Sequence, residues 1–162
     1  MQPMPSSERP PRVSLRPAVE GESRPDTSSE WDEWGPLPDP ILAPDVGRLL
    51  VTEDGVVVGD VSWHEVHYGP NAGSRAWNIG IALVPGARGR GLGAAAQRAL
   101  ADHLFATTDV DRVEASTDVA NVVEQRSLEK AGFRREGVLR SAQQRADGRH
   151  DLVVFSRLRD DR

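Results

Sequence analysis

A glycine-rich loop between a predicted strand and a predicted helix constrains this chain more than any other feature. The loop, residues 86–93, reads Gly-Ala-Arg-Gly-Arg-Gly-Leu-Gly and follows an apolar stretch at residues 76–83. An alanine-rich stretch at residues 92–105, with leucines four residues apart, predicts a helix. The first N–H groups of a helix lack intrahelical partners, and the helix dipole adds partial positive charge there. The loop therefore predicts a binding site for an anion such as phosphate.

The two arginines of this loop, Arg88 and Arg90, favour the anion interpretation, because a guanidinium can hold phosphate through two parallel hydrogen bonds. The alternative is a tight turn whose arginines are solvated surface charges. Gly89, Gly91 and Ala94 also fit the dinucleotide pattern G-x-G-x-x-G/A. A dinucleotide fold places this loop after its first strand, however, whereas at least three strand candidates precede it here. An NAD(P)-dependent oxidoreductase is therefore a distant alternative.

The 162 residues predict one domain at residues 13–162, after a flexible tail at residues 1–12 that contains four prolines. Residues 17–47 contain six prolines and predict irregular or short helical structure. The hydrophobic pattern predicts helices at 92–105 and 122–131, and strands at 13–15, 49–52, 56–64, 76–83, 110–117, 137–145 and 151–158. This order predicts an α/β fold with a mixed, partly antiparallel sheet of about six to seven strands flanked by helices.

Composition excludes several classes of site. The chain has no cysteine, which excludes disulfides, thiolate metal sites and cysteine nucleophiles, and we expect no bound metal. No apolar run is suited to a signal peptide or a membrane span, so we expect a cytoplasmic protein without a membrane partner. The net charge of −5 gives no support for a nucleic-acid partner.

Two sequence signatures resemble the GNAT superfamily of acyl-CoA-dependent N-acetyltransferases. Residues 88–93, Arg-Gly-Arg-Gly-Leu-Gly, match the motif Q/R-x-x-G-x-G/A, and residues 121–133, Asn-Val-Val-Glu-Gln-Arg-Ser-Leu-Glu-Lys-Ala-Gly-Phe, resemble the second signature. Residues 135–140 resemble the strand that follows it in the branch that acetylates N-terminal alanines of ribosomal proteins. The resemblance covers roughly residues 77–158. It implies a GNAT-like fold and direct transfer of an acetyl group from acetyl-CoA to a primary amine, either a protein N-terminus or a small cationic amine.

The resemblance also implies where acetyl-CoA binds. Its pyrophosphate would lie on the backbone N–H groups of the loop, and its pantetheine arm would pair with the backbone of the preceding strand. Asn121 would contact this arm, and it can also cap the second helix. The residues implied to bind the cofactor are Ile81, Leu83, Val84, Arg88, Gly89, Arg90, Gly91, Leu92, Gly93, Ala94 and Asn121.

The proton-transfer residues depart from the family pattern. An amine attacks only when neutral, so a base must accept its proton. Many relatives use a glutamate on the strand before the loop, but the matching residue here is Asn78, which can orient water or satisfy backbone groups. His64 is a second candidate base on the acceptor side, against a solvated or structurally bonded histidine.

Relatives protonate the leaving thiolate with a tyrosine or serine of the second helix. The tyrosine position is Leu128 and the serine position is Glu124. Partial burial would raise the pKa of Glu124 enough for acid or base catalysis. The alternative is an exposed helix glutamate paired with Arg126 or Lys130. A non-catalytic acyl-CoA-binding or sensing module is therefore the principal alternative to an enzyme.

An acidic segment predicts a cationic acceptor. Residues 17–47 hold eight acidic side chains against one base, Arg24. Trp31, Asp32, Glu33 and Trp34 lie inside it and are the expected acceptor contacts, with cation–π contacts from the indoles. The alternative is a solvated acidic loop whose tryptophans cover an edge of the core. The expected partners are acetyl-CoA and an amine acceptor, in a monomer or homodimer.

Overall fold

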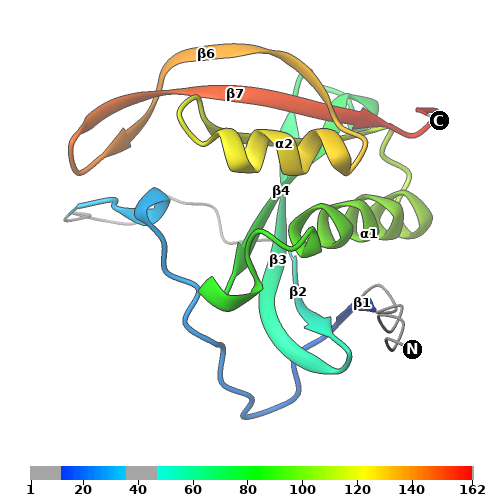
Figure 1. The fold of residues 1–162 in the computed structure, drawn as a ribbon. Coiled ribbons are helices and arrows are strands. Elements are labelled where there is room, and N and C mark those ends of the chain that lie inside the picture. Colours follow the sequence, from blue (N-terminus) through cyan, green and yellow to red (C-terminus); the bar gives the residue numbers. More distant parts are fainter. Residues whose placement is uncertain (1–11, 36–46, 162) are drawn as a thin grey trace, which may run out of the picture.

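The computed structural model describes residues 12–35 and 47–161. Its strands are β1 (Val13–Arg16), β2 (Gly47–Glu53), β3 (Val56–His67), β4 (Arg75–Leu83), β5 (Arg112–Asp118), β6 (Arg134–Arg145) and β7 (Gly148–Leu158). Its α-helices are α1 (Leu92–Thr107) and α2 (Val122–Lys130), and its short 3-10 helices are η1 (Glu30–Asp32), η2 (Ala72–Ser74) and η3 (Pro85–Ala87). Figure 1 shows their arrangement.

The strands form one mixed sheet in the order β1-β2-β3-β4-β5-β7-β6. All neighbouring strands are antiparallel except β4 and β5, which are parallel. This parallel pair is short, since only Trp77 with Val113 and Asn78 with Glu114 are in register. Beyond these residues β4 continues to Leu83 and β5 to Asp118 without pairing with each other, so the sheet splits between them.

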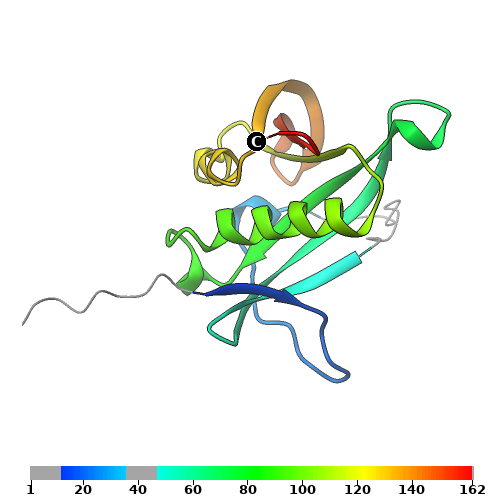
Figure 2. The same ribbon diagram turned by 90° about the vertical axis from the view of Figure 1, so that its right-hand side faces the viewer.

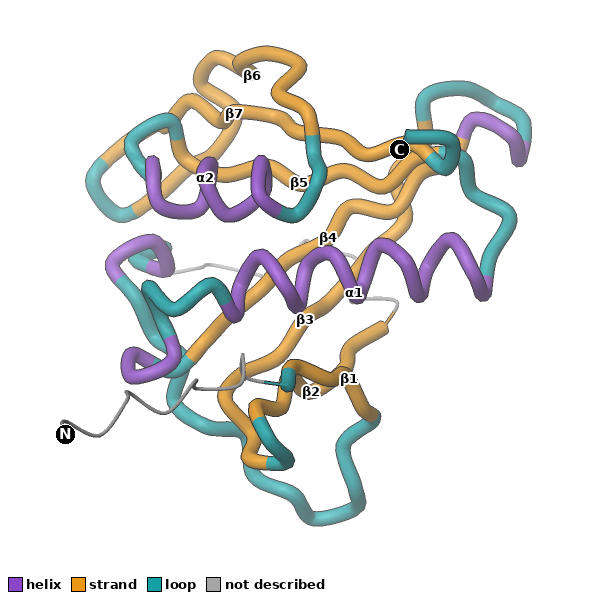
Figure 3. The backbone as a smooth tube through the Cα atoms, turned by 45° about the vertical axis from the view of Figure 1, so that its right-hand side comes forward, coloured by secondary structure: helices purple, strands orange, loops and turns teal. Residues whose placement is uncertain are grey.

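Both helices cover the same face of the sheet. Figures 2 and 3 show α1 crossing β3 and β4, with α2 beside it. Alternate side chains of β4 and β5, including Ile79 and Val113, point into the core beneath α1, where Leu100 and Leu104 are almost fully buried. Helix α1 is thus held by its apolar face. Neither described helix is long and apolar enough to cross a membrane.

The predicted fold class and the predicted order of elements are confirmed, with shifts of a few residues at the element ends. The strand predicted at 110–117 begins at Arg112, and the strand predicted at 137–145 begins at Arg134, because the pairing with β7 extends it. The predicted tail lies outside the described residues except for Arg12, whose backbone exchanges hydrogen bonds with Asp54. Residues 36–46 of the acidic segment also lie outside them.

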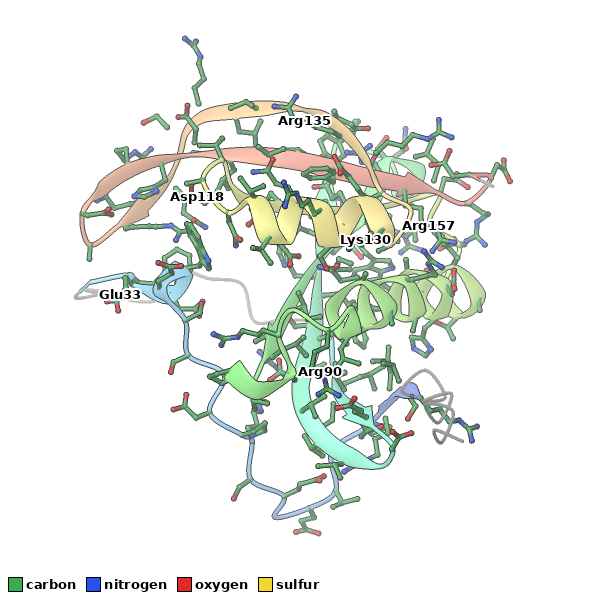
Figure 4. All side chains as sticks on the ribbon, in the orientation of Figure 1. Glu33, Arg90, Asp118, Lys130, Arg135 and Arg157 are labelled. Carbon is green, nitrogen blue, oxygen red and sulfur yellow. The ribbon has the colours of Figure 1, made fainter. Side chains whose placement is uncertain are left out.

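Residues 26–34, here called the strap, cross the side of the molecule where the β6–β7 hairpin turns (Figure 4). Arg145 at the end of β6 lies over the rings of Trp31 and Trp34, 5.9 and 5.3 Å from their centroids, and donates to the Trp31 carbonyl at 2.7 Å. The Ala146 N–H donates to the carbonyl of Glu33 at 2.9 Å. The strap is therefore fixed to the hairpin mainly by one buried guanidinium.

Arg145→Met tests this attachment, because it removes the carbonyl hydrogen bond and both cation–π contacts while keeping an apolar stem. Such contacts contribute about 0.5–2 kcal/mol each, so we expect amide hydrogen exchange in the strap to accelerate roughly tenfold or more. Arg140→Met, at an exposed position of the same strand, is the matched control. Unchanged exchange in the strap of Arg145→Met would show that other contacts hold it.

Candidate functional site

The loop between β4 and α1 presents unpartnered backbone donors. Gly89 and Gly91 have φ angles of +72° and +82°, a region that favours glycine. Gly91 is the N-cap residue of α1 and has no side chain to cap it, and the Ala95 N–H makes the first helical bond, to the Gly91 carbonyl at 3.2 Å. The N–H groups of Leu92, Gly93 and Ala94 are therefore left without an intrahelical acceptor, as an anion site requires.

The end of β4 has one free edge, and it faces the split in the sheet. The Val84 N–H donates to the Val58 carbonyl at 2.9 Å, and the Val84 carbonyl accepts from the Ala87 N–H at 3.0 Å. Backbone groups alternate between the two edges of an antiparallel strand, so the groups of Ile81 and Leu83 point away from β3. Ile81 and the N–H of Leu83 thus supply the free edge, whereas the Leu83 carbonyl accepts from Arg88 and both backbone groups of Val84 are already engaged.

The two loop arginines bind groups of the protein itself. The Arg88 Nε donates to the Leu83 carbonyl at 2.9 Å, and one of its terminal nitrogens donates to the carbonyls of Thr27 and Ser28 at 3.0 and 2.8 Å. Arg90 pairs through both terminal nitrogens with the carboxylate of Glu53, near the β2–β3 turn (Figure 4). Phosphate binding by these two side chains stays a prediction, and it would require them to change or share these partners.

Gly93 marks the point where β4, α1 and α2 meet. A Cβ atom at this position would lie 3.1 Å from the Ser127 hydroxyl and 3.8 and 3.9 Å from the side chains of Leu83 and Ile81. The first turn of α1 can therefore approach α2 this closely because residue 93 lacks a side chain. Asn121 begins α2, and its side-chain oxygen accepts from the Glu124 N–H at 3.2 Å, which confirms the predicted cap.

Glu124 faces α1 from the first turn of α2. It is half-buried, and its carboxylate accepts a hydrogen bond from the Gln97 side chain. Burial raises the pKa of Glu124 to about 7, although the hydrogen bond from Gln97 opposes this rise. The alternative of an exposed glutamate paired with Arg126 or Lys130 is wrong, because α1 lies against this face of α2. Leu128, at the position of the relatives' tyrosine, is fully buried in the core.

A polar cluster joins the strands on the sheet face opposite the helices. Glu114 is 5% exposed and accepts from the Tyr68 hydroxyl at 2.6 Å, from Arg112 Nε at 2.8 Å and from the Asn78 amide at 3.4 Å. Arg112 also pairs with Glu136 and holds the pKa of that carboxyl at about 2. The cluster lies at Asn78 and Glu114, the pair after which the sheet splits.

A pocket of about 340 Å³ opens beside this cluster. Its lining includes Tyr68, Asn78, Glu114, Glu136 and the apolar side chain of Leu139. The charged side chains of the lining are the carboxylates of Glu114 and Glu136 and the guanidinium of Arg112, so the pocket has one excess negative charge. His64 lies directly opposite Asn78 in the β3–β4 pairing, so the candidate base His64 and the residue at the position of the relatives' glutamate lie on neighbouring strands at this level of the sheet.

Sequence reasoning missed Tyr68, Arg112 and Glu114 of this cluster, and it missed Gln97. The alternation of Val113 and Ala115 with charged neighbours could have placed Arg112 and Glu114 together on the face opposite the core. No local signal identifies Tyr68 as their partner, because the contact spans 46 residues. In the part of the chain that the structure describes, no three histidine, aspartate or glutamate side chains are grouped to hold a metal.

The chain is similar to a protein family and to several solved structures. A family model described as an acetyltransferase (GNAT) domain matches residues 18–134. An acetyltransferase of the GNAT family from Bacillus anthracis is 21% identical with a TM-score of 0.60, over 70% of this chain and 66% of that chain. RimJ from Mycobacterium smegmatis, solved in complex with CoA-disulfide, is 24% identical with a TM-score of 0.61, over 68% and 52%.

The ribosomal-protein-S5-alanine acetyltransferase of Vibrio fischeri is 22% identical with a TM-score of 0.61, over 70% of this chain and 62% of that chain. At these identities the three structures share the fold. The matched region spans between about half and two thirds of each of these proteins.

The raised pKa of Glu124 predicts a pH-dependent effect of Glu124→Gln on stability. The folded-state pKa of about 7 exceeds the ordinary value of 4.5, so wild-type stability from this group is present below pH 4.5 and is lost as pH rises through 7. We therefore expect the variant to gain roughly 2–4 °C in Tm over wild type at pH 8.5, and little at pH 5. Glu129→Gln, exposed on the same helix, is the control. An equal difference in Tm at both pH values would contradict the raised pKa.

Proposed function

Since the chain belongs to the GNAT acetyltransferase family, we propose that it transfers the acetyl group of acetyl-CoA to a primary amine. The observation that carries this proposal is the uncapped start of α1 beside the free edge of β4. The first can bind a pyrophosphate, and the second can pair with an extended amide-containing chain, which are the two recognisable parts of the cofactor.

The cofactor would bind along the split in the sheet. Its pyrophosphate would accept from the N–H groups of Gly89 to Ala94, and its pantetheine arm would pair with Ile81 and Leu83. The amide nitrogen of Asn121 remains available to this arm, because its oxygen is used in the cap. The acetyl group would then lie toward Asn78 and Glu114, where the strands come together.

The acceptor amine would enter through the pocket on the opposite face. The excess carboxylate charge beside Tyr68 and Glu136 would attract an ammonium group. Attack requires the neutral amine, whose nitrogen forms the new bond to the acetyl carbon as the carbon–sulfur bond breaks. Asn78 cannot accept the proton, but its amide, held by Glu114, can orient a water molecule that carries it away.

Glu124 would protonate the departing thiolate. It occupies the position where relatives place a serine, and Gln97 and Ser127 link its side chain to Gly93, which lies beside Leu83 and Ile81 of β4. A carboxyl group with a pKa of about 7 is about half protonated at neutral pH and can donate to a thiolate, whose ordinary pKa is about 8.5. A general acid in this position would contribute about 10²–10⁴-fold to the rate.

Trp31 and Trp34, expected from the sequence to contact the acceptor, contact Arg145 instead. The rings of Trp31 and Trp34 lie against Arg145, so each indole already makes a cation–π contact within the protein. Asp32 and Glu33 remain exposed on the strap and can attract a cationic acceptor over a distance. We propose a basic peptide N-terminus or a small polyamine as the substrate class. The likeness to ribosomal-protein-alanine acetyltransferases supports the peptide.

A non-catalytic acyl-CoA-binding module is the second candidate, and two observations favour it. Asn78 replaces the base, and Leu128 replaces the tyrosine of the family pattern. The two functions differ in one measurable respect, since both bind acetyl-CoA but only the enzyme releases free coenzyme A in the presence of an amine. Assay of thiol release with a panel of basic peptides and polyamines distinguishes them.

Substitution of Gly91 tests the cofactor site. Asparagine and aspartate are almost isosteric and both tolerate positive φ, so Gly91→Asn and Gly91→Asp share the same backbone cost and differ in charge. We expect acetyl-CoA at 100 times Kd to stabilise the wild type by about 2.7 kcal/mol. Gly91→Asp should lose this thermal shift, and Gly91→Asn should retain most of it. Equal shifts in both variants would place the pyrophosphate elsewhere.

The role of Glu124 is tested by the kinetics of Glu124→Gln. The amide keeps the shape and the hydrogen bond from Gln97 but cannot donate a proton to the thiolate with the strength of a carboxylic acid. We expect kcat to fall by about 10²-fold or more, and the binding of acetyl-CoA to remain unchanged. Wild-type kcat with a wild-type pH profile in this variant would remove Glu124 from the reaction.

A further inference from the structure

A buried amide links the two helices at the proposed site. Gln97 lies in the second turn of α1 and is 2% exposed, among residues that otherwise contribute apolar side chains to the core. A buried amide without hydrogen bonds would be costly, and both ends of this one are paired. Its nitrogen donates to the Glu124 carboxylate, and its oxygen accepts from the Ser127 hydroxyl at 3.1 Å.

These two contacts fix which way the amide faces. An ionised carboxylate can only accept, so the NH₂ group points to Glu124, and the Ser127 hydroxyl, which can donate or accept, donates to the amide oxygen on the other side. An NH₂ group can donate but cannot accept, so it stabilises the carboxylate more than the carboxylic acid. Ser127 in turn sits against Gly93, at the start of α1 where the cofactor loop ends. The side chains of Ser127 and Gln97 thus connect the loop to Glu124.

We propose that Gln97 is a positioning residue, whose amide holds the Glu124 carboxylate at the junction of α1 and α2 and stabilises its ionised form. Its catalytic consequence rests on the proposed function of Glu124. Without this donor, Glu124 would be free to rotate away from α1 and would have no polar partner on the facing helix.

Among the described residues around Glu124, Gln97 is the group that stabilises the ionised carboxylate. Among the described residues Glu124 has no ion pair, and burial and the Gln97 hydrogen bond are the two causes that shift its pKa. On α1 the neighbouring cation Arg98 donates to the Lys130 carbonyl. On α2, Arg126, Glu129 and Lys130 are exposed. A single uncharged contact therefore opposes the effect of burial.

The test is Gln97→Met, which keeps the length of the side chain in the core and removes the donor. The titration of Glu124 is followed by NMR of carbon-13-labelled glutamate carboxyl groups in the protein without cofactor, and Glu124→Gln identifies the resonance. We expect the pKa of Glu124 to rise by about one unit, the effect of losing one hydrogen bond to a charged group. An unchanged pKa would overturn the proposal.

Ser127→Ala is the second variant, since it leaves the core side chains intact and removes the hydroxyl that orients the amide. The pKa of Glu124 should move in the same direction but by less, because the amide keeps its NH₂ group; a wild-type pKa in Gln97→Met overturns the proposal whatever Ser127→Ala shows. The pH dependence of kcat distinguishes the effect of Gln97 on the pKa of Glu124 from the role of Glu124 in proton transfer. If the carboxyl pKa moves in Gln97→Met and the kcat profile does not, Gln97 tunes Glu124 as proposed, but Glu124 does not transfer the proton.

Discussion

The short parallel pairing of β4 with β5 is the constraint on which the rest of the site depends. Two residue pairs join the strands, and beyond Asn78 and Glu114 the two strands no longer pair with each other. Antiparallel neighbours hold both halves of the sheet, so the split is maintained by topology as well as by side chains. Glu114 reinforces the joint, because its buried carboxylate binds groups from the β3–β4 loop, β4 and β5 together. The unpaired edge of β4 is thereby kept open for a ligand.

The starts of both helices lie beside the split in the sheet. Because β4 ends in the glycine loop, the uncapped start of α1 lies at the mouth of the split, and Gly93 lets α2 approach it. This close approach also places Glu124 against Gln97 in a half-buried position, which raises the pKa of its carboxyl group. The proposed anion binding and the proposed proton transfer thus both depend on one packing arrangement, in which a residue without a side chain, Gly93, lies between two helix starts.

The sequence predicted what depends on local patterns and missed what depends on contacts between distant segments. The strand, glycine loop and helix around Gly91 follow from periodicity and from helix-end chemistry, and the Asn121 cap follows from its position. No local sequence pattern predicts that Arg88 binds the strap or that Arg145 lies over the tryptophans of the strap. The latter contact spans more than a hundred residues, as does the hydrogen bond from Arg145 to the Trp31 carbonyl. Burial of Glu114 likewise depends on a distant loop.

Backbone amide NMR during a titration with coenzyme A tests most directly whether the start of α1 binds the cofactor. The N–H groups of residues 89–94 should show the largest chemical-shift changes, saturating with a single Kd, and Ile81 and Leu83 should follow with the same Kd. Amides on the opposite face, such as that of Leu139, should change little. Saturable binding that leaves residues 89–94 unshifted would contradict the assignment of the anion site to this helix.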